Sequence, residues 1–170
     1  ADAAERLWSV VESNIPSPTN EALWAAPGTM VAAWHMLQWA GEPRWRDLDA
    51  FGHVNNSHFL TYLEEARIRW FETFGGQWVN EAMAPLLAAV QLNYRAPIDY
   101  PSESLIELFA ERIGTTSLTV GHRIRSADGS VLHADGHVVM VWIDRATGRP
   151  IALPELVLKA LRGMEEMGSG

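Results

Sequence analysis

Five residues within one short stretch have types suited to acyl chemistry: Asp49, Gly52, His53, Asn55 and Asn56. They lie directly before an amphipathic segment, and a helix beginning there presents unpaired backbone N–H groups and the positive end of its dipole. A carboxylate a few residues earlier can lie beside an oxygen that those N–H groups hold. A carboxylate next to an oxyanion site is what acyl hydrolysis needs. The stretch therefore predicts acyl hydrolysis.

The same residues also have structural explanations. Asp commonly caps a turn that precedes a helix, so Asp49 could do only that. Asn55 or Asn56 could serve as the helix N-cap. Gly52 fits a backbone turn or a close approach of substrate. A structural and a chemical role are compatible, because the donors at a helix N-terminus are backbone N–H groups, which need no particular side chain.

Other polar side chains offer weaker candidates. A triad of Asp49 with His53 and His58 is not favoured, because the chain has no G-x-S-x-G motif, so His53 is expected to hydrogen-bond within the loop. Glu64 is a rival carboxylate on the helix, although an edge pair with Arg67 is the more usual role.

A second polar group lies near the C-terminal half of the chain. His133, Asp135 and His137 would share one face of a strand. Their spacing is loose and no fourth ligand is evident, so no metal site is expected.

A helix is predicted from about residue 56 to residue 74. Apolar residues recur there at i, i+4 and i+7 spacing and define one buried face: Phe59, Leu63, Ala66, Trp70 and Phe74. Two consecutive glycines, Gly75 and Gly76, provide a C-terminal stop. This helix would carry Asn56 at its first turn.

Most of the remaining chain, up to residue 144, is predicted to form strands. Alternating apolar segments separated by turn residues predict strands over 86–95, 105–113, 117–126 and 131–144. A short strand over 44–48 and a closing helix over 155–164 complete the pattern. One long apolar helix beside four or five antiparallel strands predicts an α+β domain in which the sheet wraps the helix.

Residues 1–40 are predicted to form an apolar N-terminal extension to the main domain at 41–167. The segment 3–12 has helical periodicity, and either a helix over 29–40 or a strand over 31–38 could follow. Its four tryptophans are too hydrophobic to remain solvated, so we expect an ordered cover that shapes the acyl pocket.

Composition excludes several classes of function. The net charge of −8 argues against nucleic-acid and anionic-membrane binding, and the absence of Cys excludes a thiolate nucleophile or disulfides. No apolar run approaches the roughly 18 residues of a membrane span. The sequence has no recognisable signal peptide, so a cytoplasmic location is expected.

The motif D-x-x-G-H-V-N-N at 49–56, followed by Y-L-E-x-A-R at 62–67, resembles the 4-hydroxybenzoyl-CoA thioesterase branch of the hot-dog superfamily, which includes long-chain acyl-CoA thioesterases. The resemblance continues through 92–97 and 134–136 and covers about 42–164. It implies a hot-dog fold, Asp49 as the catalytic carboxylate and a backbone N–H near Asn56 that polarises the thioester oxygen.

The implied reaction converts an acyl-CoA to a free acid and CoA without a cofactor or metal. Substrate binding is assigned to His53, Asn55, Glu64, Arg95 and Arg112. The family often uses basic residues near a strand-to-strand turn, but here that turn, 114–117, has no Arg or Lys. An acyl-carrier-protein substrate, or contacts from a neighbouring subunit, is therefore an alternative, as is a non-catalytic acyl-binding module.

A homodimer or homotetramer is expected, because a sheet of this size leaves edges that need covering. The eight tryptophans also suit an oligomer interface. The resemblance implies paired sheets with active sites at the subunit boundary.

Overall fold

The computed structural model describes residues 39–41 and 43–167 of the chain. The predicted helix and cover within residues 1–38 lie outside this range. In chain order the described elements are β1 (Trp39–Gly41), the 3₁₀ helix η1 (Trp45–Asp47), α3 (Asn56–Glu72), β2 (Met83–Tyr94), β3 (Ser104–Ile113), β4 (Ser117–Ser126), β5 (Leu132–Asp144) and α4 (Glu155–Met167).

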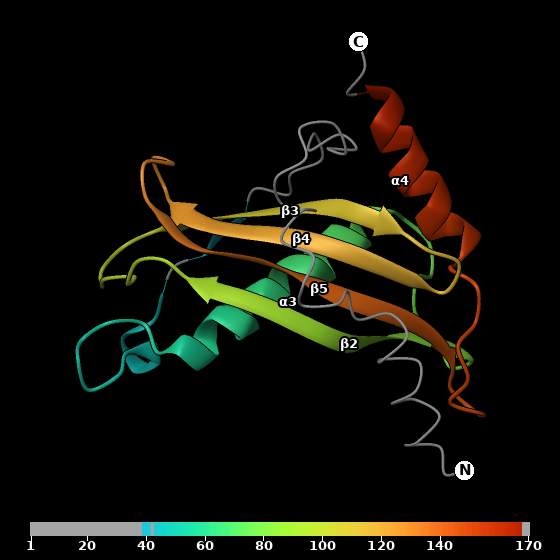
Figure 1. The fold of residues 1–170 in the computed structure, drawn as a ribbon, viewed down its shortest axis with the longest axis horizontal. Helices are drawn as coiled ribbons and strands as arrows, with labels where there is room; N and C mark the ends of the chain where they lie inside the picture. The colour runs from blue at the N-terminus through green and yellow to red at the C-terminus, as the bar shows by residue number, and fades with distance from the viewer. Residues whose placement is uncertain (1–38, 42, 168–170) are drawn as a thin grey trace, which may run out of the picture.

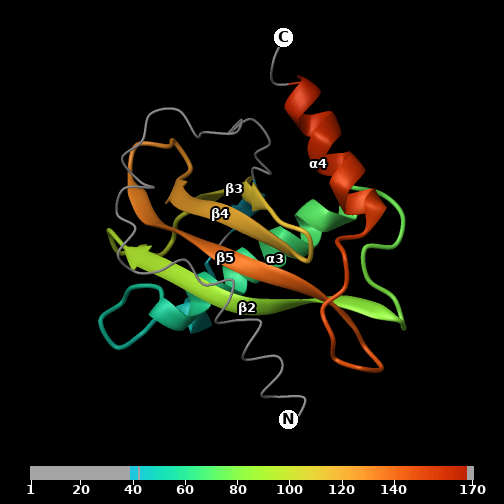
Figure 2. The same ribbon diagram turned by 45° about the vertical axis from the view of Figure 1, so that its right-hand side comes forward.

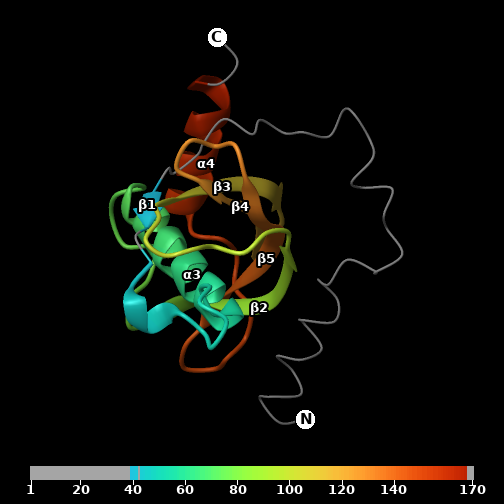
Figure 3. The same cartoon turned by 90° about the vertical axis from the view of Figure 1, so that its left-hand side faces the viewer.

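One antiparallel sheet curves around α3, as Figure 3 shows from the side. The strand order is β1-β3-β4-β5-β2, so β1 and β2 form its two edges. In Figure 1, α3 crosses behind the strands, while α4 lies at one end of the sheet (Figure 2). This is the hot-dog arrangement that the sequence predicted.

The buried face of α3 agrees with its apolar spacing. Phe59, Leu63, Ala66 and Trp70 are each at most 2% exposed, and they pack against core residues of β3, β4 and β5. The predicted fifth member, Phe74, is only partly buried because the helix ends at Glu72. The helix ends two residues before the predicted end, and both glycines that follow adopt positive φ values that side chains disfavour.

Several predicted element boundaries were wrong. Residues 44–48 contain the helix η1 instead of a strand, because the Asp47 carboxylate accepts the Arg44 N–H and closes a tight turn. β2 begins at Met83, three residues early, after Asn80 caps the preceding turn through its side-chain oxygen. The predicted alternative of a helix over 29–40 is wrong for its last two residues, because Trp39 and Ala40 pair with β3 as a strand. The helix α4 ends at Met167, three residues later than predicted. The other strand boundaries lie within a residue of those predicted.

A histidine lies in the core between the sheet and α3. His122 on β4 is 1% exposed, pairs across the sheet with Gly136 on β5, and neither ring nitrogen has a hydrogen-bond partner among the described residues. Burial, and then the nearby charge of Arg67, lowers the pKa of His122 to about 3. The imidazole is therefore neutral in the folded protein across the physiological range.

Stability should fall as the pH drops below the ordinary histidine pKa. The unfolded chain takes up a proton on this residue near pH 6.5, whereas the folded chain resists protonation down to about pH 3. This one group should cost about 2 kcal/mol of unfolding free energy between pH 8 and pH 5. Urea unfolding of His122→Leu at both pH values should show a correspondingly smaller loss than wild type. Equal losses in the two proteins would contradict the assignment.

Candidate active site

The loop that carries Asp49 is closed by backbone hydrogen bonds. The Asp49 N–H donates to the His53 carbonyl at 2.8 Å, and the Gly52 N–H donates to the Asp49 carbonyl at 3.1 Å. Gly52 has φ +81°, a left-handed conformation that glycine adopts without strain, so the predicted backbone turn is confirmed. Outside this turn, Leu48 and Val54 form an antiparallel bridge that joins the two arms of the loop.

The Asp49 carboxylate caps the turn, as one of the two sequence-based explanations proposed. Its Oδ1 accepts the Phe51 N–H at 2.8 Å and the His53 N–H at the longer distance of 3.4 Å. Among the described residues, every hydrogen bond to this carboxylate goes to Oδ1. The side chain is partly exposed, so Oδ2 can meet a water molecule or a substrate carbon while Oδ1 holds the orientation.

The helix N-terminus beside this loop is formed by Asn55 and Asn56. Asn55 is the N-cap: its Oδ1 accepts the Ser57 N–H at 2.9 Å, and its carbonyl accepts the His58 N–H at 2.9 Å. Within the described part of the chain, the Asn56 N–H is not bonded by the cap or by a backbone carbonyl. The carbonyl of Asn56 accepts the Tyr94 hydroxyl of β2 at 3.0 Å, which fixes this first helical residue. An amide held in this way is suited to donate to a substrate oxygen.

The two histidines of the motif are directed to other carboxylates. His53 Nε2 lies 3.5 Å from Asp99 Oδ1, and His58 Nδ1 lies 4.0 Å from Asp47 Oδ1. The backbone of His53 is bonded to Asp49, as predicted for a residue that organises the loop. The structure therefore does not bring a histidine ring to the Asp49 carboxylate.

The remaining predicted substrate-binding residues are dispersed. Glu64 is exposed on α3 and interacts electrostatically with Arg67. Arg95 follows β2 and forms a two-point ion pair with Asp135 (Nε–Oδ2 2.9 Å, Nη2–Oδ1 3.0 Å). Arg112 is exposed and pairs in the sheet with Thr119, at the end of β3 remote from η1. One loop–helix junction thus carries the five motif residues at 49, 52, 53, 55 and 56, whereas Arg95 is paired with Asp135 and Arg112 lies at the far end of β3.

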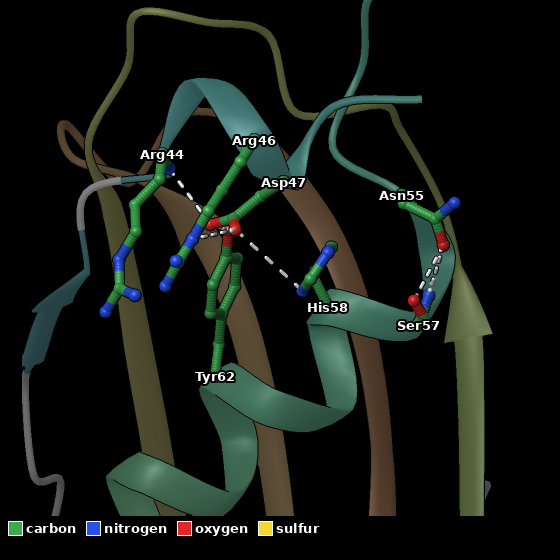
Figure 4. A network of polar contacts seen from close by, with 7 residues as sticks. All are labelled: Arg44, Arg46, Asp47, Asn55, Ser57, His58 and Tyr62. Atoms are coloured by element: carbon green, nitrogen blue, oxygen red, sulfur yellow. Dashed lines mark hydrogen bonds and ion pairs between the residues drawn. The ribbon is translucent and has the colours of Figure 1, made fainter. Parts of the chain in front are cut away.

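Sequence reasoning missed a second carboxylate next to the loop. Asp47 is 5% exposed and accepts hydrogen bonds on Oδ2 from the Arg44 N–H at 2.9 Å and from the Tyr62 hydroxyl at 2.8 Å (Figure 4). Burial by itself raises the pKa of Asp47, but these two bonds and the nearby His58 outweigh it, so the pKa is lowered. Burial, together with the same bond, raises the pKa of Tyr62. The D-x-D spacing of Asp47 and Asp49 was the available signal.

One residue of the predicted polar face of β5, Asp135, has a structural role. Asp135 binds Asn93 and Arg95 across the neighbouring strand. Among the residues that the structure describes, no group of three or more His, Cys, Asp or Glu side chains is arranged to hold a metal ion. None of the helices in this part of the chain is both long and apolar enough to cross a membrane.

Comparisons with known proteins all point to the same family. A model of the thioesterase-like superfamily matches residues 43–161. A provisionally named acyl-CoA thioesterase from Xanthomonas campestris is 45% identical, with a TM-score of 0.60 over 65% of this chain and 96% of that one. A thioesterase from Thermus thermophilus, solved with coenzyme A and Zn, is 34% identical, with a TM-score of 0.66 over 76% and 93%.

A relative with a named activity matches at the level of sequence. The long-chain acyl-CoA thioesterase FadM of Escherichia coli strain K12 is 29% identical over 108 residues, which cover 62% of this chain and 82% of that protein. The family match, the fold and the motif at the mouth of α3 all agree: this chain belongs to the thioesterase-like superfamily and is a thioester hydrolase with the hot-dog fold.

Proposed function

We propose that the protein hydrolyses an acyl-CoA thioester, with Asp49 as the catalytic carboxylate and the Asn56 N–H as an oxyanion donor. The observation that carries this proposal is the placement of the two groups at one loop–helix junction. The Asp49 turn leads through Val54 and Asn55 directly into α3, and Asp49 retains one oxygen without a hydrogen bond from the described residues. A base beside a helix amide is the arrangement that acyl transfer requires.

As a general base, Asp49 removes a proton from water while the water oxygen bonds to the thioester carbon. The carbonyl electrons move onto oxygen, where the Asn56 N–H and the helix dipole stabilise the negative charge. Collapse of the intermediate breaks the carbon–sulfur bond and releases CoA thiolate, which recovers the proton from Asp49. As a nucleophile, Asp49 would instead form an acyl anhydride that water then hydrolyses. Both routes yield one acid and one CoA.

The nature of the relatives supports coenzyme A as the carrier. The Thermus structure is named as a complex with coenzyme A, and the Escherichia coli relative is named for long-chain acyl-CoA. A hydrolysis screen over acyl-CoA chain lengths and aromatic acyl groups, with detection of the free thiol, tests the proposal. Hydrolysis confined to acyl carrier protein would favour that alternative, and tight acyl binding with no thiol release would identify a non-catalytic module.

The two arginines expected to bind the CoA phosphates are Arg95 and Arg112. Arg95 is already paired with Asp135, so a phosphate there would have to compete with two charge-assisted bonds. Arg112 lies at the remote end of β3. If a neighbouring subunit placed its own Arg112 beside Asp49, that arginine would provide a cation for the CoA phosphates.

The protein should form a homodimer or homotetramer through β2. This edge strand is twelve residues long and carries three exposed apolar side chains: Leu87, Val90 and Tyr94, each between 44% and 49% exposed. An edge of this kind favours pairing with another chain. Light scattering at micromolar concentration should give a multiple of the 18.9 kDa chain mass. A stable monomer would contradict the prediction.

A further inference from the structure

The loop that carries Asp49 begins at Asp47 and ends at Asn55. The Asn55 N–H donates to the Asp47 carbonyl at 2.8 Å, so the two residues where the loop begins and ends are joined by their backbones. Asn55 is also the N-cap of α3. These backbone contacts attach the loop to α3 at the first turn of the helix, while the Val54 N–H separately donates to the Ile98 carbonyl at 2.9 Å.

The Asp47 side chain supplies a second attachment, to the body of α3. Its carboxylate is bonded to the hydroxyl of Tyr62, which lies in the second turn of the helix, fifteen residues away in sequence (Figure 4). The same oxygen accepts the Arg44 N–H, which fixes the carboxylate relative to η1. Tyr62 is partly buried and Asp47 is almost fully buried, so the bond is shielded from competition by water.

The reaction requires Asp49 and the Asn56 N–H to act on one carbonyl group at the same time. Asp49 is two residues from Asp47, whereas Asn56 belongs to the helix that carries Tyr62. The Asp47–Tyr62 bond therefore sets the separation of the two groups, and a displacement near 1 Å can cost about a hundredfold in rate. We propose that Asp47 is a positioning residue, which holds the Asp49 loop against α3 through the Tyr62 hydroxyl. This inference rests on the proposed role of Asp49.

Substitutions at Asp47 and Tyr62 can distinguish a hydrogen bond that positions the loop from a requirement for the negative charge of Asp47. Both bonds to Asp47 fall on one oxygen, Oδ2, so the amide oxygen of Asp47→Asn can still accept both. Tyr62→Phe keeps the ring and removes only the hydroxyl, and Asp47→Ala removes the acceptor. We expect Tyr62→Phe and Asp47→Ala to lower kcat by at least about tenfold with KM little changed, and Asp47→Asn to retain near wild-type kcat.

A matched hydroxyl deletion at the other end of α3 controls for general effects on the helix. The Thr73 hydroxyl donates to the Trp70 carbonyl at 2.6 Å, and Thr73→Val removes that bond without approaching the loop. All variants are compared after urea unfolding has shown that they are folded under assay conditions. Loss of stability with unchanged kcat in Tyr62→Phe and Asp47→Ala would show that the contact serves folding alone, and would overturn the proposal.

A double-mutant cycle separates this inference from the proposed function. If the contact acts through Asp49, Tyr62→Phe should have almost no further effect on kcat in an Asp49→Asn background, although it slows the enzyme that retains Asp49. Independent, multiplying losses would overturn the positioning role and leave the role of Asp49 intact. Wild-type kcat in Asp49→Asn alone would overturn the proposed function and this inference with it, whatever the effect of Tyr62→Phe.

Discussion

Replacing Asp49 with Asn should lower kcat by about a hundredfold or more, the usual scale for loss of an acid–base group. The amide has the same size and can still accept the Phe51 N–H, so the turn should persist. It can neither take a proton from water nor attack a thioester. Because the change acts on the transition state, KM should change little. Steady-state kinetics on the best substrate of the acyl-CoA screen provide the measurement.

Glu64→Gln is the matched control for this variant. It is the same carboxylate-to-amide change, on an exposed residue of α3 that could act as the rival base. Its effect should be much milder. Equal losses in the two variants would indicate a mechanism shared between carboxylates, and full activity in Asp49→Asn would remove the basis of the proposed mechanism.

Replacing Asn56 with Pro should cost kcat about 10²- to 10³-fold, the scale for removal of one oxyanion donor. Proline has no N–H, so the substitution deletes the proposed donor while keeping the carbonyl that binds Tyr94. The first position of a helix tolerates proline well. The preceding residue, Asn55, has φ −61° and ψ 138°, an extended conformation that proline allows in its neighbour.

Asn56→Ala isolates the backbone from the side chain. It retains the N–H and should keep near wild-type activity, whereas a side-chain role would make it as damaging as the proline variant. Circular dichroism and thermal unfolding would verify that α3 survives in both. A folded Asn56→Pro enzyme with normal kcat would show that the oxyanion is held elsewhere.

The predictable parts of the structure were those encoded by local patterns. The start of α3 at Asn56 follows from a cap residue before a helical apolar period, and β4 follows from turns on both sides. The loop conformation at Asp49 and Gly52 was also accessible, because turn preferences depend on a few adjacent residues. Here local preference and overall fold favour the same arrangement.

The missed parts depend on contacts between distant segments. The Asp47–Tyr62 bond joins a 3₁₀ turn to a helix, and a D-x-D sequence does not reveal which carboxylate faces inward. The ion pair of Arg95 with Asp135, forty residues away in sequence, was likewise not predicted. That pairing follows from the register of β2 against β5, in which Asn93 lies opposite Asp135. Register was not available from the spacing of either strand alone.

Through the hydrogen bond from Tyr94 to Asn56, the proposed subunit association would act on the proposed oxyanion donor. Tyr94 lies on the exposed edge strand β2, and its hydroxyl supports the carbonyl of the residue whose amide is proposed to polarise the thioester. A chain that pairs with β2 would restrain this tyrosine and, through it, the first turn of α3. Specific activity would then follow mass action: it would decline on dilution through the dissociation constant of the assembly and recover as subunits recombine.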